Sequence, residues 1–273
     1  MTESVSRFAY AKITLFLRIA GKSGDRHEIE ALQQSIGLFD EITLTKRQDN
    51  EITSDFAGDN SLVVLKKLAE SFSLGGMHLS VTKHIPIGGG LGGSSADAAA
   101  AALACAELWN LDPERVKKIV SPLFGDVAFQ MTGGTALVRG FGEQVDSLPD
   151  LPLYHVLLVF PEKGVSTAEA YALSDSLPKG HGNALSLYWA LTRGEKADRH
   201  YLNDLLPAAT VLNDEIAPIL SRMQDDKALL TGMSGSGSTL FALYRTHADA
   251  VAAAEKLAVP FLVTTTTPAL CEK

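Results

Sequence analysis

The sequence predicts an α+β protein of 273 residues whose two halves pack closely together. Segments that alternate between apolar and polar residues, as strands do, are interspersed with segments whose apolar residues recur at helical spacing. The proline-flanked stretch 147–153 interrupts both patterns, which indicates a boundary between residues 1–150 and 151–273. Since no low-complexity linker occurs at this boundary, we expect the two halves to be packed rather than tethered.

The first half is expected to mix strands and helices. Alternation or apolar runs predict strands at 9–19, 40–45, 77–83 and 134–140. Leucines at helical spacing predict a helix over 61–72, and the alanine-rich run from Ala96 to Trp109 predicts a second one because alanine has the highest helix propensity.

The second half begins with an apolar strand and ends with a strand, a helix and a strand. The expected strands are 154–160, 238–244 and 260–266, and the expected helices are 166–177, 183–193, 208–223 and 246–258.

Composition and charge narrow the class of protein. A net charge of −8 argues against binding to nucleic-acid backbones, because such proteins normally carry a basic face. Cys105 and Cys271 show neither metal-binding spacing nor a disulfide framework. The chain has no basic-then-apolar signal segment and no run of about 18 apolar residues, so we expect no membrane association and a cytoplasmic location. Oligomeric state is not indicated.

A glycine-rich loop precedes the alanine-rich helix. Five of the six residues at 88–93 are glycine, and Ser94 or Ser95 is expected to cap the helix that follows. A helix N-terminus offers unpaired N–H groups and the positive end of a dipole, and glycine lets the backbone approach an anion closely. The stretch therefore predicts a phosphate-binding loop.

Two other nucleotide-binding motifs fit this loop less well. Residues 88–93 match the dinucleotide fingerprint Gly-x-Gly-x-x-Gly, but that fold needs an acidic residue ending a second strand about 20 positions later, and Asp112 lies in an interhelical turn. A P-loop needs a lysine at its end, and none occurs between Lys83 and Lys117. A tightly packed turn without a ligand remains an alternative.

The stretch IPIGGGLGGSSADAAA resembles the phosphate loop of the GHMP superfamily of small-molecule kinases, named for galactokinase, homoserine kinase, mevalonate kinase and phosphomevalonate kinase. Three further stretches, at 11–30, 123–131 and 230–244, are similar to the branch of that superfamily that phosphorylates 4-diphosphocytidyl-2-C-methyl-D-erythritol. The resemblance extends from about Ala9 to the last helix. It implies a ribosomal-protein-S5-like N-terminal half, a ferredoxin-like C-terminal half and a cleft between them.

The resemblance implies ATP and Mg²⁺ as cofactors, with magnesium bridging the β- and γ-phosphate oxygens. The residues it assigns to the phosphates are Pro86, Gly88, Gly89, Gly90, Leu91, Gly92, Gly93, Ser94, Ser95 and Ala96. Ser95 could also approach the metal, and Asn60 matches a position near the adenine but could instead cap the helix after it. The loop 233–239 corresponds to a segment that closes the phosphate region, unless it is a plain turn.

Lys12 and Asp126 are the candidate catalytic residues. Phosphoryl transfer to an alcohol needs a carboxylate near the attacking hydroxyl and a cation near the transferred group. Asp126 lies between apolar stretches, where an unpaired carboxylate is costly to bury, so it requires a cationic partner. The resemblance implies that Asp126 accepts the hydroxyl proton and that Lys12 keeps it ionised; a solvated lysine and a structural aspartate are the alternatives.

The resemblance places the substrate near four residues. His27 corresponds to a histidine that reads the cytosine ring, and Tyr171 is either an aromatic wall for that ring or a core residue of its helix. Thr14 stands where the family usually has asparagine, and Arg26 where it has tyrosine, so we expect the Arg26 guanidinium to stack on the base instead. The rival functions are a homoserine- or mevalonate-type GHMP kinase and a non-catalytic nucleotide-binding protein.

Overall fold

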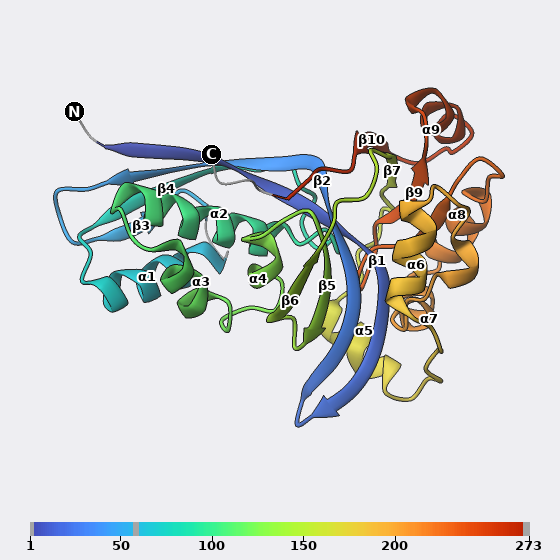
Figure 1. The fold of residues 1–273 in the computed structure, drawn as a ribbon, viewed down its shortest axis with the longest axis horizontal. Helices are drawn as coiled ribbons and strands as arrows, with labels where there is room; N and C mark the ends of the chain where they lie inside the picture. The colour runs from blue at the N-terminus through green and yellow to red at the C-terminus, as the bar shows by residue number, and fades with distance from the viewer. Residues whose placement is uncertain (1–2, 57–59, 270–273) are drawn as a thin grey trace.

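The computed structural model describes residues 3–56 and 60–269, which form two sheets flanked by helices. Figure 1 shows helices α1–α4 with strands β3 and β4 at one end of the molecule and helices α6–α9 at the other. A long hairpin runs along the first group and then bends down between the two groups. Cys271, one of the two cysteines considered above, lies outside the described residues, and Cys105 is a buried free thiol.

The hairpin consists of β1 (Ser4–Ser23) and β2 (Arg26–Lys46), which pair along nearly their whole length with three register shifts. Alternation predicted only 9–19 and 40–45 of this hairpin. Residues 31–36 of β2 are buried on both faces, so that part of the strand has no alternating pattern to detect. The hairpin tip turns through Gly24, whose positive φ suits glycine.

Six strands form the first sheet. Besides the hairpin they are β3 (Ile52–Ser54), β4 (Met77–Thr82), β5 (Thr135–Gly140) and β6 (Gln144–Leu148), in the order β3-β4-β2-β5-β6 with β1 paired to β2. The short strands β3 and β6 were not predicted. Strand β6 occupies the start of the stretch in which we expected only a boundary.

Helices α1 (Asn60–Phe72), α2 (Gly93–Leu108), α3 (Pro113–Val120) and α4 (Val127–Gln130) accompany this sheet. Ten of the sixteen residues of α2 are buried, eight of them alanines, so the helix can pack close to β1 and β2 on one side and α1 on another. This close packing fixes the N-terminus of α2 relative to β1. The predictions for α1 and α2 are confirmed.

The second sheet comes from the C-terminal half. Its strands are β7 (His155–Val159), β8 (Leu230–Met233), β9 (Leu240–Tyr244) and β10 (Phe261–Thr265), all antiparallel in the order β10-β7-β9-β8. Around it lie α5 (Thr167–Ser174), α6 (Ala184–Thr192), α7 (Leu206–Leu212), α8 (Ile216–Arg222) and α9 (His247–Ala254), with a 3-10 turn at Asp198–His200.

The single helix predicted over 208–223 is wrong, because Asn213 divides it. The Asn213 side chain donates to Lys163 O at 2.7 Å and accepts from Glu215 N at 2.9 Å. An asparagine that satisfies backbone groups in this way competes with helical hydrogen bonding. Helix α7 therefore ends before Asn213, and α8 starts at Ile216.

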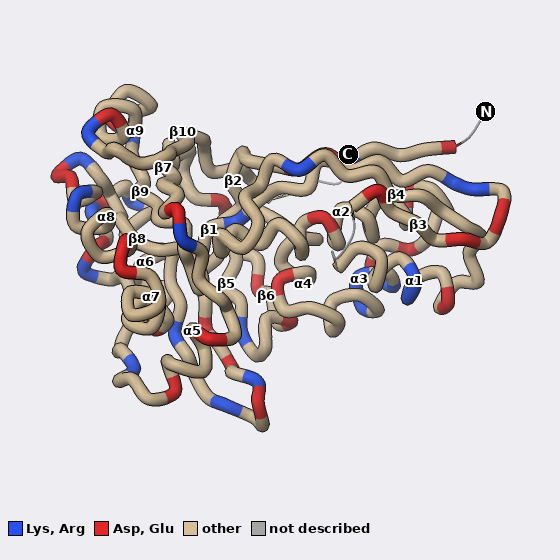
Figure 2. Tube along the Cα trace, turned by 180° about the vertical axis from the view of Figure 1, so that it is seen from behind, with Lys and Arg blue, Asp and Glu red and all other residues tan. Residues whose placement is uncertain are grey.

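One apolar core joins the two halves. A single cluster of buried side chains includes Leu32 of β2, Leu158 of β7 and Tyr188 of α6. Basic and acidic residues are interspersed along the described part of the chain, as Figure 2 shows. Within that part, no helix is both long and apolar enough to cross a membrane.

Candidate active site

The glycine loop ends in a backbone turn at Gly92. Gly88, Gly90 and Gly92 have φ values of 72°, 76° and 72°, a region that side-chain-bearing residues rarely adopt. Gly92 occupies the N-cap position of α2 without any side-chain cap, so the expected cap by Ser94 or Ser95 is wrong. Ser94 Oγ instead accepts a hydrogen bond from Asn60 N at 3.2 Å.

The loop 233–239 packs directly onto the glycine loop. Ser234 Oγ donates to Gly90 O at 2.9 Å, and Thr239 N donates to Gly89 O at 3.2 Å. A Cβ on Gly90 would lie 2.2 Å from Ser234 O, so only glycine permits this contact. Asn203 holds the second loop: its Nδ2 donates to Met233 O and to Gly235 O at 3.0 and 2.9 Å.

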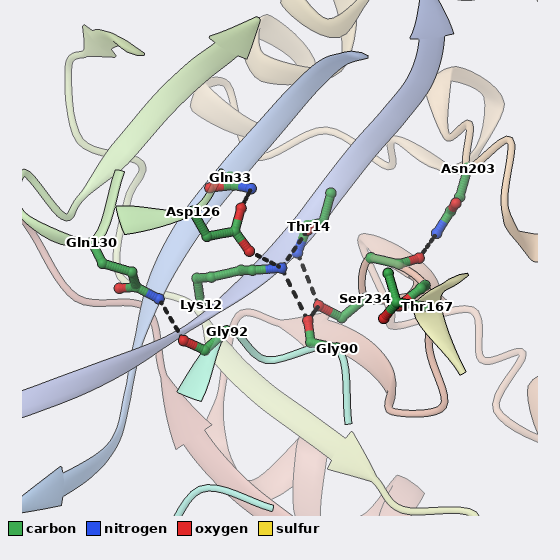
Figure 3. Close-up of polar contacts among 12 residues, drawn as sticks. Lys12, Thr14, Gln33, Gly90, Gly92, Asp126, Gln130, Thr167, Asn203 and Ser234 are labelled. Carbon is green, nitrogen blue, oxygen red and sulfur yellow. Dashed lines mark hydrogen bonds and ion pairs between the residues drawn. The ribbon is translucent and has the colours of Figure 1, made fainter. Parts of the chain in front are cut away.

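Lys12 extends from β1 into the space between these loops, as Figure 3 shows. Its Nζ donates to Gly90 O at 3.0 Å and to Thr14 Oγ1 at 3.1 Å, and it lies 3.6 Å from Asp126 Oδ2. The side chain is only 5% exposed. A buried ammonium needs such partners, so Lys12 is not a solvated strand lysine.

Asp126 faces Lys12 from the start of α4. It occupies the N-cap position, yet its carboxylate makes no cap hydrogen bond. Asp126 Oδ1 accepts from Gln33 Nε2 at 3.0 Å. Gln33 lies on β2 directly opposite Thr14 of β1, so the hairpin brings together the residue that contacts Asp126 and the residue that contacts Lys12.

A cavity of about 270 Å³ opens between the two loops and the hairpin. The residues that line it include Lys12, Thr14, Gln33, Pro86, Gly88 to Ser95, Asp126, Thr167, Tyr171, Gly235 and Ser236. Ala96, which was expected at the phosphates, and Asn60, which was expected near the adenine, are not among them. Ala96 is buried in α2, where its N–H donates to Gly92 O at 2.8 Å, and Asn60 is the first residue of α1.

A second cavity, of about 460 Å³, adjoins the hairpin tip and α5. Its lining includes Lys22, Arg26, His27, Phe141, Tyr171 and Asp175. Tyr171 lines both cavities, and its ring stacks on that of His27 with centroids 4.8 Å apart. Tyr171 is therefore a cavity wall rather than a residue of the core.

Charged and aromatic contacts order the second cavity. Asp175 accepts from His27 Nε2 at 2.6 Å and from Lys22 Nζ at 2.5 Å, and the hydrogen bond from Lys22, followed by that from His27, lowers the pKa of Asp175 to about 2. The Arg26 guanidinium lies over the Phe141 ring at 4.1 Å. Burial, together with the charge of Asp126, raises the pKa of Tyr171 to about 12.

Comparison with known proteins identifies the family. Residues 60–135 match the model of the GHMP kinase N-terminal domain, and residues 187–260 match that of the GHMP kinase C-terminal domain. The 4-diphosphocytidyl-2-C-methyl-D-erythritol kinase of Desulfitobacterium hafniense is 38% identical, with 90% of this chain and 89% of that protein covered. The chain belongs to this kinase family.

Other relatives and solved structures agree with this membership. The kinase of the same name from Pelotomaculum thermopropionicum is 35% identical, with 88% of each chain covered. A crystal structure of 4-(cytidine 5'-diphospho)-2C-methyl-D-erythritol kinase matches with a TM-score of 0.83 and 28% identity, covering 96% of this chain and 99% of that one. Homoserine kinase from Cytophaga hutchinsonii shares the fold at 20% identity, with 98% of this chain and 96% of that one covered and a TM-score of 0.72. The two-domain α+β GHMP kinase fold is confirmed.

In this member of the kinase family, the structure brings Lys12, Thr14 and Asp126 together at the glycine loop, and His27, Arg26 and Tyr171 around the adjoining cavity. Sequence reasoning missed four polar residues that shape these sites: Gln33, Asn203, Ser234 and Asp175. Ser234 lies within the loop 233–239, which the resemblance had indicated. The other three acquire their partners only through folding, since those partners are distant in sequence.

Proposed function

We propose that the protein transfers the γ-phosphoryl group of ATP to the 2-hydroxyl of 4-diphosphocytidyl-2-C-methyl-D-erythritol, in the non-mevalonate route to isoprenoid precursors. The names of its curated relatives support this substrate. The observation that carries the proposal is that one cavity brings the Lys12 ammonium and the Asp126 carboxylate against the glycine loop at the N-terminus of α2.

The glycine loop forms the nucleotide end of the proposed site. The first turn of α2 presents unpaired N–H groups and the positive end of the helix dipole, both of which favour phosphate. Mg²⁺ usually keeps several waters and binds through nucleotide phosphates with few protein ligands. The Ser95 hydroxyl lines the cavity at the glycine loop and is the proposed neighbour of the ion. Bound there, the ion would neutralise charge on the β- and γ-phosphates.

Asp126 and Lys12 divide the work of the transfer. The Asp126 carboxylate takes the proton of the substrate hydroxyl as that oxygen bonds to the γ-phosphorus, and the bond from phosphorus to the β-phosphate oxygen breaks to release ADP. Lys12 stabilises the negative charge that develops on the transferred group. The partial exposure of Asp126, 30%, leaves its carboxylate open to the cavity for this contact.

The second cavity forms the cytosine end of the proposed site. Because the Asp175 carboxylate is ionised at neutral pH and only accepts hydrogen bonds, His27 Nε2 must carry a hydrogen. In neutral His27 the other nitrogen, Nδ1, is then an acceptor, which suits the N4 amino group of cytosine. The Tyr171 ring supplies an aromatic surface, and Arg26, held over Phe141, remains the proposed stacking partner of the base.

ADP release in the presence of different alcohols tests the proposal. The diphosphocytidyl alcohol should stimulate ADP release, and homoserine and mevalonate should not. Stimulation by either of those alcohols alone would indicate a different GHMP kinase, and no stimulation by any of them would indicate a non-catalytic nucleotide-binding protein. The division at residue 150, the cytoplasmic location and the lack of nucleic-acid or membrane partners stay predictions from the sequence.

A further inference from the structure

We propose that Gln33 is a positioning residue that holds the Asp126 carboxylate for proton transfer. This inference rests on the proposed function, because it assigns a part in the same reaction. Gln33 Nε2 donates to Asp126 Oδ1 at 3.0 Å, while Lys12 Nζ lies 3.6 Å from Asp126 Oδ2. Figure 3 shows the two side chains reaching the carboxylate from the two strands of the hairpin.

Asp126 depends on these neighbours for its orientation. It begins α4, a helix of only four residues, and its side chain makes no hydrogen bond to that helix. A carboxylate that is 30% exposed and unsupported by its own segment can rotate away from the substrate hydroxyl. Contacts from β1 and β2 fix the plane of the carboxylate by joining it to the most extensively paired part of the sheet.

The side-chain amide of Gln33 has only part of the hydrogen bonds that a purely structural glutamine would make. A carboxylate only accepts hydrogen bonds, so the amide nitrogen must face Asp126 and the oxygen must face away. That oxygen, Oε1, is buried and has no hydrogen-bond partner among the described residues. Gln33 as a whole is only 2% exposed. A buried acceptor without a partner destabilises a protein. We infer that the amide is retained for Asp126 rather than for stability.

The neighbouring Gln34 provides a matched control with the opposite character. It is also buried on β2 but points to the other face of the sheet. Its Nε2 donates to Ser35 O and Thr267 O, both at 2.8 Å, and its Oε1 accepts from Thr135 Oγ1 at 2.5 Å. Every polar atom of the Gln34 amide is partnered, as expected of a structural glutamine.

The test compares Gln33→Met with Gln34→Met, measuring kcat, KM for ATP and Tm with whichever alcohol the wild-type enzyme phosphorylates. Methionine keeps nearly the length and volume of glutamine without its polar atoms. Gln33→Met should lower kcat about tenfold or more, since misplacing a reacting group is costly, and leave KM for ATP unchanged. Its Tm should stay equal or rise by a few degrees. Gln34→Met should lower Tm and keep kcat within about twofold.

A second variant, Gln33→Glu, examines the hydrogen bond itself. At neutral pH the introduced carboxylate faces Asp126 and repels it, so kcat should fall below that of Gln33→Met. When the pH is lowered, the introduced group takes up a proton and can donate to Asp126. Activity relative to wild type should therefore recover at acidic pH in Gln33→Glu and not in Gln33→Met.

The outcomes separate this inference from the proposed function. If the wild-type enzyme turns over and Gln33→Met has a normal kcat, the role of Gln33 is overturned and the proposed function stands. The same conclusion follows if the kcat of Gln33→Met falls only in proportion to a loss of Tm. A Gln33→Glu enzyme without any acid recovery overturns this role as well. A wild-type protein that phosphorylates none of the alcohols overturns the proposed function and this inference with it.

Discussion

Lys12 Nζ lies 3.6 Å from Asp126 Oδ2, yet the two groups differ in burial: the Lys12 side chain is 5% exposed and that of Asp126 is 30% exposed. From the sequence we expected Asp126 to be the buried charge that requires a partner. The structure shows the reverse, because Lys12 passes beneath the glycine loop while Asp126 faces the cavity. The ammonium is therefore the charge whose stability depends on its neighbours.

Replacing either member of this pair should reduce turnover by about 10²-fold or more, the usual scale for losing a general base or a charge stabiliser. Asp126→Asn should stay folded, because an asparagine oxygen can still accept from Gln33. Lys12→Ala leaves a void as well as removing the charge, so Lys12→Met, which fills the space, separates the two effects. Steady-state kinetics with Tm measured on the same samples would check this, and near-normal turnover in either variant contradicts the assignment.

Gly92→Val should raise KM for ATP and also lower kcat. A Cβ at this position would lie 2.9 Å from Gln130 Nε2 and 3.1 Å from Lys12 Cε, in a backbone conformation with φ of 72°. The substitution therefore disturbs the phosphate loop and Lys12 together. Gly75→Ala is a suitable control, since nothing lies within 4 Å of the added Cβ and its φ is not positive. Unchanged ATP kinetics in a folded Gly92→Val protein would support a turn without a ligand.

A buried charge cluster behind the loop makes stability depend on pH. Lys83 Nζ lies 2.5 Å from Asp40 Oδ2 and 2.6 Å from Asp97 Oδ2, and both carboxyl groups are inaccessible to solvent. Burial raises the pKa of Asp97 to about 7, although Lys83 opposes this shift. Burial alone would lower the pKa of Lys83, but the hydrogen bonds that its ammonium donates to Asp40 and Asp97 raise it.

Because the folded-state pKa of Asp97 exceeds its ordinary value of 3.8, the folded protein holds a proton that the unfolded chain releases between about pH 4 and pH 7. The contribution of Asp97 should therefore favour folding at the acidic end of this window and lose strength as the pH rises through it. In Asp97→Asn, the change in the free energy of unfolding between the two ends of this pH window should be smaller than in the wild type by more than about 1 kcal/mol, which is the free energy of roughly one pKa unit. Urea unfolding at pH 5 and pH 7.5 measures the difference, and parallel curves for both proteins would contradict the prediction.

Local sequence patterns predicted many of the helices and strands. Alanine content located α2, alternation located β4, β5 and parts of the hairpin, and the glycine run located the phosphate loop, because each of these signals lies within a few residues of the structure it predicts. The central part of β2 escaped detection, since residues buried on both faces do not alternate. The break between α7 and α8 was not predicted, because it depends on a hydrogen bond from Asn213 to Lys163 O, which is distant in sequence.

Site residues could be predicted where they belong to a sequence motif. They could not be predicted where their role depends on a partner that is distant in sequence. Motifs predicted Lys12, Asp126 and His27 as candidates, and the structure places these residues at the two cavities. Gln33 and Asp175, which contact Asp126 and His27, belong to no motif. Ser94 was expected to cap α2 because serine favours that position. The positive φ of Gly92 ends the loop one residue before Gly93 begins the helix, which leaves Ser94 free to accept from Asn60.

Base selectivity is the remaining prediction, and it depends on the contact between Asp175 and His27. CMP or CDP should compete with the alcohol substrate, and UMP much less, because uracil presents a carbonyl where cytosine presents an amino group, and the mismatch costs about 1–3 kcal/mol. His27→Ala should weaken the diphosphocytidyl substrate roughly tenfold or more and spare ATP. Asp175→Asn should narrow the preference for CMP over UMP, since an amide no longer fixes the hydrogen on His27 Nε2. Asp226→Asn, at a fully exposed carboxylate, is the control. If CMP and UMP compete equally and His27→Ala leaves the affinity for the diphosphocytidyl substrate unchanged, the cytidylyl assignment is wrong and the protein is a GHMP kinase with another substrate.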